Sequence, residues 1–277
     1  MSEVATNSTF GSYRLHERIN GGGMADIWHA SDAQGQSYAL RLMHKSLRFN
    51  FFAKKRFFRG CEVLSQIHNH EYVVTYVDHG KIGGQPYCVM EYIEGDNLKL
   101  LFSRGDDVVT EFVGNILIDM AIALQHVHDS GFMHLDFKPE NVMVSRNGNV
   151  RLVDFDLSMP RPPKPTKMGR TPGTPAYMAP EQLQRKPVDH RADIWAYGVT
   201  AYELLTDRKP FTGESGKEIL QAQLNRDALF LMPRSVNPEL PANLEKIVLK
   251  CLEQDPDNRY QDMTYLVRDL EGALYVA

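Results

Sequence analysis

Two short segments, 134–141 and 153–156, carry polar residues whose types and spacing suit the chemistry of a phosphate group held by a metal ion. Asp136 and Asn141 are expected to leave a strand and turn back toward one magnesium-phosphate site, and Asp154 to end a second strand beside it. Mg²⁺ prefers oxygen ligands, and an aspartate in such a loop can orient a hydroxyl nucleophile. An Asp and an Asn at this spacing are also common as solvated loop residues, so other motifs must decide between the two interpretations.

The order of the motifs resembles that of protein kinases. Segment 134–141 reads H-L-D-F-K-P-E-N and segment 153–156 reads V-D-F-D, where the family has H-R-D-L-x-x-x-N and D-F-G. At least five further motifs follow the family order, and the resemblance extends from about Tyr13 to Leu270. It implies that Asp136 accepts the proton of a substrate hydroxyl, that Lys138 neutralises the transferring phosphoryl group, and that Asn141 and Asp154 hold Mg²⁺.

Segment 19–28, I-N-G-G-G-M-A-D-I-W, resembles the glycine-rich loop of bacterial Ser/Thr kinases. Glycine lets backbone amides approach phosphates without a Cβ in the way, but Asn20 and Ala25 replace two of the family glycines, so a plain hairpin turn remains an alternative. Segment 89–95 resembles the hinge between the two kinase lobes, where main-chain groups bind adenine. The ATP contacts implied by the resemblance are Ile19, Gly21, Gly22, Gly23, Ile27, Ala39, Arg41, Met90, Glu91, Ile93, Asn97 and Met143.

The ion pair that aligns ATP in kinases is predicted to be missing. Arg41 stands where the family has a lysine, and an arginine fork is no conservative replacement for a compact ammonium. Counting along the helix marked by Phe57, Leu64 and Ile67, the family glutamate falls on Gly60 or Cys61, and Glu62 is turned about 200° from the inward face.

This ATP clamp is therefore either abandoned or rebuilt. Lys45 or Lys99 is a candidate substitute cation, although a solvated surface lysine is the simpler interpretation of each. If the clamp is only weakened, Arg41→Lys with Gly60→Glu is expected to raise phosphoryl transfer. The five phenylalanines and the basic residues between Phe49 and Arg59 indicate either a partner-binding surface or, more simply, a core face and a solvated face of one helix.

Other departures concern regulation. Leu135 replaces the arginine that binds an activation-loop phosphate in the family, and Asp156 replaces the glycine of D-F-G. Segment 158–175 corresponds to the activation segment and is rich in Pro, Lys, Arg and Thr, which disfavours regular structure. Thr166 and Thr171 are phosphorylation candidates, but with Leu135 present phosphorylation is not expected.

The segment G-T-P-A-Y-M-A-P-E at 173–181 matches the substrate-facing end of the activation segment, with Thr174 placed to bond Asp136 and Lys138. The resemblance also pairs Glu181 with Arg259 and makes Asp193 a cap for the backbone of the catalytic loop. These last roles support the fold and do not discriminate between an active and an inactive protein.

Composition agrees with an ordinary globular chain of 277 residues, 43% hydrophobic and 24% charged. A net charge of −4 gives no indication of nucleic-acid binding, and three separated cysteines favour a reduced compartment. The start is predicted to be a polar tail. The apolar stretch 108–124 is interrupted by Glu111, Asn115 and Asp119 and is predicted to be a buried amphipathic helix, with no membrane segment. Residues 112–128 are predicted to form one long buried helix that leads into the catalytic loop. A cytoplasmic location follows as the default.

The fold class expected from the resemblance is α+β. It comprises a polar tail (1–9), a small antiparallel β N-lobe with one main helix (10–92) and a larger, mostly helical C-lobe (93–277), with a single kinase domain over 13–270. Two functions remain open. The first is a Ser/Thr protein kinase that uses ATP and Mg²⁺ on protein hydroxyls, with impaired or atypical ATP clamping. The second is a pseudokinase that acts as a binding or scaffold module for protein partners. A small-molecule phosphotransferase fits less well, because the 173–181 segment is typical of protein kinases.

Overall fold

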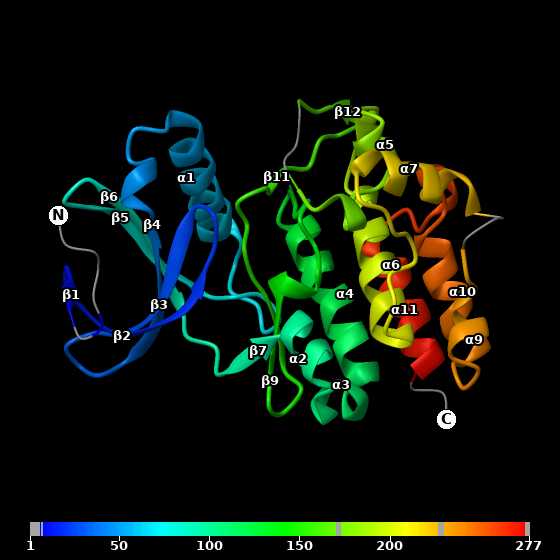
Figure 1. Ribbon diagram of the computed structural model, residues 1–277, viewed down its shortest axis with the longest axis horizontal. Helices are drawn as coiled ribbons and strands as arrows, with labels where there is room; N and C mark the ends of the chain where they lie inside the picture. Colours follow the sequence, from blue (N-terminus) through cyan, green and yellow to red (C-terminus); the bar gives the residue numbers. More distant parts are fainter. Residues whose placement is uncertain (1–5, 7, 170–172, 227–229, 275–277) are drawn as a thin grey trace.

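The computed structural model describes residues 6, 8–169, 173–226 and 230–274. Two lobes lie side by side along its longest axis (Figure 1), and the predicted two-lobed kinase fold is confirmed. The N-terminal lobe is an antiparallel sheet in the order β1-β2-β3-β4-β6-β5. Its strands are β1 (Thr9–Phe10), β2 (Tyr13–Gly21), β3 (Ala25–Ser31), β4 (Ser37–Met43), β5 (Tyr76–Ile82) and β6 (Gln85–Glu91).

Both faces of this sheet are apolar in its central part, which explains the apolar runs in the sequence. One face buries a cluster that includes Trp28, Leu40 and Val89. The opposite face is covered by α1 (Phe51–Gln66), which follows the short helix η1 (Lys45–Leu47) and begins at Asn50, whose side chain accepts a hydrogen bond from the backbone N–H of Ala53. The cluster beneath α1 comprises Met24, Ala25, Met43, Phe57, Cys61 and Cys88. The predicted inward face of this helix is confirmed, since Phe57, Leu64 and Ile67 are buried and Glu62 is exposed.

The C-terminal lobe is built around α4 (Val113–Asp129) and α6 (Arg191–Thr206), which pack against each other. The long helix predicted over 112–128 is confirmed as α4. The stretch 108–124 is not one helix, because α3 (Asp107–Glu111) and α4 are separate helices that meet at Phe112, whose backbone is not helical (φ −110°, ψ 16°). The other helices are α2 (Leu98–Arg104), α5 (Pro180–Leu183), α7 (Gly216–Leu224), α9 (Pro233–Val236), α10 (Ala242–Cys251) and α11 (Met263–Leu274), with single turns η2 (Pro139–Asn141), η3 (Pro175–Tyr177) and η4 (Pro256–Asn258).

Short strands bring the functional loops together. Strands β7 (Gly95–Asn97), β9 (Val142–Ser145) and β10 (Val150–Leu152) form a sheet in the order β10-β9-β7, and β8 (Phe132–Met133) pairs with β11 (Met159–Pro160). The activation segment was predicted to lack regular structure, yet it contributes β11 and β12 (Thr166–Lys167), and β12 pairs with β13 (Pro187–Val188). The catalytic-loop segment runs from β8 to β9, and the metal-loop segment follows β10.

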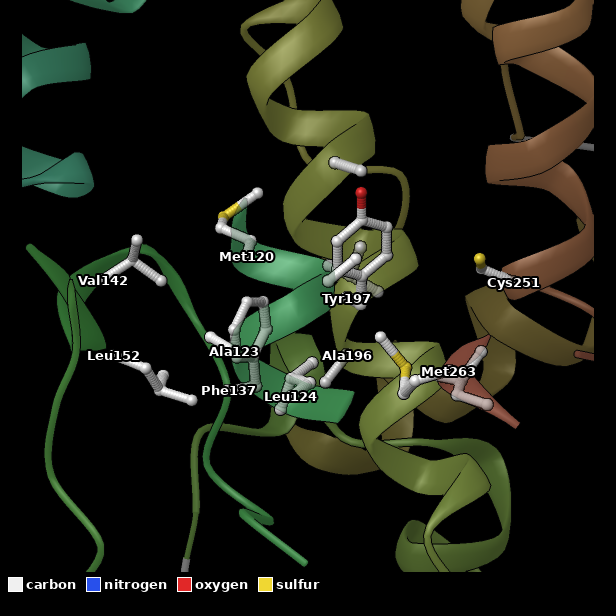
Figure 2. Close-up of a cluster of buried hydrophobic side chains, with 14 of the residues drawn as sticks. Met120, Ala123, Leu124, Phe137, Val142, Leu152, Ala196, Tyr197, Cys251 and Met263 are labelled. Atoms are coloured by element: carbon white, nitrogen blue, oxygen red, sulfur yellow. The ribbon is translucent and has the colours of Figure 1, made fainter. Parts of the chain in front are cut away.

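One side chain of the catalytic-loop segment anchors it in the core of the C-terminal lobe. Phe137 is 1% exposed and its ring stacks on that of Tyr197, with centroids 6.2 Å apart. Figure 2 shows Phe137 among Ala123 and Leu124 of α4 and Tyr197 of α6. The polar residues on either side of Phe137 are therefore held by the packing of two central helices and not by the loop alone.

Candidate active site

A cavity of about 990 Å³ lies between the two lobes. Its wall combines the glycine-rich segment, the strand that carries Arg41, the hinge and both loop segments. Of the predicted ATP contacts, Gly21 is not part of the wall. The wall does contain Ile19, Gly22, Gly23, Ile27, Ala39, Arg41, Met90, Glu91, Ile93, Asn97 and Met143, together with the predicted residues Lys138, Asn141, Asp154 and Thr174.

The glycine-rich segment closes as a turn between β2 and β3. The backbone N–H of Gly22 donates to the carbonyl of Ala25 (3.0 Å), and the side chain of Asn20 accepts from the N–H of Gly21 (2.7 Å). A Cβ added at Gly23 would meet no atom within 4 Å. Packing within the protein therefore does not require glycine at this position, whereas a ligand that approaches the backbone closely would.

The catalytic-loop side chains form one hydrogen-bonded group. Lys138 Nζ donates to the Asp136 carboxylate (2.8 Å) and to the hydroxyl of Thr174 (3.2 Å). The amide nitrogen of Asn141 donates to the same carboxylate (3.1 Å) and to the backbone carbonyl of Asp136 (2.8 Å). A carboxylate, an ammonium and a hydroxyl thus meet in one group. Lys138 and Thr174 line the cavity, and Asp136, which is not part of its wall, is joined to it through Lys138. Thr174 bonds Lys138 as predicted.

Asp193 of α6 fixes the backbone of this loop, which confirms the predicted cap. Its carboxylate accepts from the N–H groups of His134 (2.8 Å) and Leu135 (2.7 Å) and from His128 Nε2 (2.8 Å). Burial by itself would raise the pKa of Asp193, but the hydrogen bonds from His128 and from the N–H of Leu135 help to lower it overall. Leu135 has φ +62°, a conformation that a residue with a Cβ rarely adopts. The two N–H bonds hold the chain in this turn.

Asn141 and Asp154 offer oxygen donors on the cavity wall. Because the amide nitrogen of Asn141 makes both of its hydrogen bonds to Asp136, its amide oxygen is the atom that it would offer to a metal. Burial alone would raise the pKa of Asp154, but Arg41 and the hydrogen bond from the N–H of Asp156 lower it overall, so the carboxyl is held ionised. One carboxylate and one amide oxygen fit Mg²⁺, which takes its remaining ligands from phosphates and water.

The family lysine–glutamate pair is absent, as predicted, because position 41 is an arginine and position 60 a glycine. Arg41 instead forms a two-pronged pair with Asp156, with N–O distances of 2.7 and 2.5 Å, and its guanidinium lies 3.7 Å from Asp154. The carboxylate that faces Arg41 thus comes from the metal-loop segment and not from α1, where it was expected. A Cβ at Gly60 would lie 2.7 Å from Asp156 Oδ1, so the glycine on α1 leaves the space that this carboxylate occupies.

The remaining candidate cations do not replace Arg41. Lys99 Nζ pairs with Glu203 of α6 (3.1 Å), and Lys45 lies in η1, outside the wall of the cavity. The predicted structural pair is confirmed, since Arg259 donates to both carboxylate oxygens of Glu181 (2.7 and 2.8 Å). Leu135, which replaces the family's phosphate-binding arginine, is 5% exposed and packs in the core of the C-terminal lobe.

Comparison with known proteins agrees with this geometry. The model of the protein kinase domain family matches residues 13–269. The chain belongs to the protein kinase family. Serine/threonine-protein kinase Pkn1 of Myxococcus xanthus is 35% identical to it over 277 residues, which cover 95% of this chain and 38% of that protein. A Streptomyces coelicolor protein named "Probable serine/threonine-protein kinase SCO3848" is 33% identical over 275 residues, which cover 95% of this chain and 40% of that protein.

This kinase chain therefore spans about two fifths of the length of the curated relatives it matches. In the part of the kinase that the structure describes, no helix has the length and apolar character needed to cross a membrane. Of the two phosphorylation candidates, Thr166 is exposed in β12, and Thr171 lies outside the described residues.

Two hinge-region residues of the kinase use their side chains for structure. Glu91 Oε1 accepts from the N–H of Thr75 (3.0 Å) and from Arg151 Nε (3.2 Å), and Asn97 caps α2 by accepting from the N–H of Leu100 (3.0 Å). Any adenine contact in this region would then come from main-chain groups, as the resemblance implies.

The sequence analysis did not find Arg59. Its guanidinium donates to the backbone carbonyl of Asp156 (3.1 Å) and so ties α1 to the metal-loop segment. Nothing in the sequence singles out Arg59. The sequence does show Gly60 in the middle of a helix, where glycine is unfavourable, and the extra carboxylate Asp156 in the metal loop.

Proposed function

We propose that this kinase domain transfers the γ-phosphoryl group of Mg-ATP to serine or threonine hydroxyls of proteins. The observation that carries the proposal is the group formed by Asp136, Lys138 and Thr174 at the edge of a cavity whose wall also bears Asn141 and Asp154. The relatives' names support the same activity, and three buried free cysteines support the cytoplasm as its location.

Each residue has a role that follows from its contacts. The Asp136 carboxylate accepts the proton of the substrate hydroxyl and is oriented for this by Lys138 and Asn141. The Lys138 ammonium neutralises charge on the phosphoryl group in transit, and its bond to Thr174 keeps it at the edge of the cavity. Asn141 and Asp154 would hold Mg²⁺, which would supply positive charge to neutralise the phosphates.

The test is transfer of radiolabelled phosphate from ATP to the chain itself and to a mixture of unfolded protein substrates. Asp136→Asn is expected to reduce the rate by about 10²- to 10⁴-fold, the usual contribution of a positioned base. The matched control is Asp129→Asn, because Asp129 is an exposed carboxylate at the end of α4. Equal rates for wild type and Asp136→Asn would exclude the proposed role.

A binding module without catalysis is the second candidate. It is favoured by Asn20 and Ala25, which replace two of the glycines of the family's glycine-rich loop, and by the ion pairs of Arg41 with two carboxylates. A thermal titration with ATP, with Mg²⁺ and again with a chelator, separates the cases, because binding raises stability by RT ln(1 + [L]/Kd). A magnesium-dependent rise without any phosphate transfer identifies the binding module. A flat response in both conditions excludes Mg-ATP as a ligand.

A further inference from the structure

The Arg41 guanidinium is fixed on three sides. Asp156 holds it with two hydrogen bonds, Asp154 lies 3.7 Å away, and the Phe57 ring of α1 lies beneath it with its centroid 5.2 Å from Cζ. The side chains of Arg41 and Asp156 are 15% and 9% exposed, so water competes little for the pair. The cation stands on the cavity wall beside Asp154, one of the two proposed metal ligands.

The pair between Arg41 and Asp156 requires the space that glycine leaves at position 60. A Cβ at this position would lie 2.7 Å from Asp156 Oδ1, closer than packed atoms allow, and 3.0 Å from Asp156 Cα, which is tighter than most packed contacts. A glycine inside a helix is less favourable than alanine by about 1 kcal/mol, and here the missing Cβ makes room for a carboxylate. Arg59, the preceding residue, binds the carbonyl of Asp156, so α1 shapes the loop from two consecutive positions.

We propose that the Arg41–Asp156 pair positions Arg41 against the phosphates of ATP, with the carboxylate supplied by the metal-binding loop and with Gly60 as the space that admits it. This inference rests on the proposed function. Asp156 and Asp154 lie two residues apart on one loop, and both face the same guanidinium. One short segment therefore fixes the position of the Arg41 guanidinium relative to Asp154, the proposed metal ligand. Arg41, Asp156 and Gly60 are positioning residues, since they act through the placement of one cation.

Two substitutions and a matched control test the pair. Asp156→Asn keeps the shape and removes the charge, and Gly60→Ala pushes a methyl group into the carboxylate. Each is expected to weaken Mg-ADP binding about tenfold and to lower kcat by up to about 100-fold, the usual loss when reacting groups shift by about 1 Å. Gly272→Ala, in α11, is the control for glycine in a helix, because a Cβ there meets no atom within 4 Å. It should change neither quantity.

A rescue variant separates positioning from stability. Asp156→Gly combined with Gly60→Glu returns the carboxylate to α1 and is expected to recover at least tenfold in kcat over Asp156→Gly alone. In contrast, the gain expected from the sequence for Arg41→Lys with Gly60→Glu should not appear, because Asp156 still fills the space that a glutamate at position 60 needs. Affinities are measured at a temperature where each variant is folded, as checked by denaturant titration.

The outcomes are distinct. If Asp156→Asn lowers stability but leaves Mg-ADP affinity and kcat within twofold of wild type, the pair is purely structural and the proposal is wrong. If wild type transfers no phosphate but binds Mg-ADP, the proposed function fails, and the affinities of Asp156→Asn and Gly60→Ala still decide the inference. Failure of wild type to bind Mg-ADP overturns both. If the rescue variant does not fold, the comparison of Asp156→Asn with wild type decides alone.

Discussion

Replacing Asp193 by asparagine should show how strongly the fold holds the catalytic loop. Asp193 is 0% exposed, and its two oxygens accept hydrogen bonds from two backbone N–H groups and from His128. Asparagine has the same shape but only one acceptor oxygen. Whichever way the amide turns, its NH₂ group faces the N–H of either His134 or Leu135, and that buried donor loses its partner.

The magnitude follows from these three bonds. An unpaired buried N–H costs about 1 to 3 kcal/mol, and the two remaining bonds fall from charge-assisted to neutral strength, a loss of about 1 kcal/mol each. Removing a buried charge offsets part of this loss. We expect the free energy of unfolding to drop by about 3 kcal/mol, a large part of the ~5 to 15 kcal/mol of a typical domain. Leu135, held at φ +62°, is also expected to relax and to displace Asp136.

The assay is denaturant unfolding of wild type and Asp193→Asn, together with kcat for phosphate transfer. Asp257→Asn is the control, because its side chain is 81% exposed and its pair with Arg191 should contribute less than about 1 kcal/mol. A loss below about 1 kcal/mol for Asp193→Asn, or an unchanged kcat in the folded variant, would refute the view that this carboxylate holds the loop.

Two further predictions concern a half-buried carboxylate, Asp119, and a buried one, Glu181. Burial raises the pKa of Asp119 from 3.8 to about 6, so the folded state binds this proton more tightly than the unfolded chain, and the resulting stability is lost as pH rises from about 4 through 6. Asp119→Asn is therefore expected to raise the free energy of unfolding at pH 8 by about 1 to 2 kcal/mol after allowance for solvent screening. The measurement is denaturant titration at pH 8 and at pH 4. A gain of equal size at pH 4 would contradict this account. Glu181→Gln should lower the free energy of unfolding by about 3 to 5 kcal/mol, because it leaves Arg259, whose side chain is 0% exposed, without its charge partner; an equally stable variant in the same titration would show that Arg259 is satisfied by its backbone acceptors.

Several features could be predicted from the sequence because they depend on local order. Asp136, Lys138 and Asn141 lie within a few residues of one another in one loop, so their side chains can reach each other, and the structure does join them. The inward face of α1 follows from helical periodicity, and the burial of Phe57 and Leu64 confirms it. The start of α4 agrees with the helix predicted from Phe112, but the apolar pattern continues across Phe112 and did not show that α3 is a separate helix.

The sequence by itself determined the family, the two-lobed α+β fold and the residues gathered at the candidate site, since these follow from motif order and hydrophobic period. Only the tertiary structure showed which carboxylate pairs with Arg41. Arg41 and Asp156 are 115 positions apart, and their pairing depends on the space left by Gly60 on a third element. In the sequence, Arg41 replaces the family lysine, Gly60 replaces the family glutamate, and Asp156 is an additional carboxylate. In three dimensions the Asp156 carboxylate occupies the space left by Gly60. A buried cation such as Arg41 needs an opposite charge within contact distance, and any segment that reaches it can provide that charge.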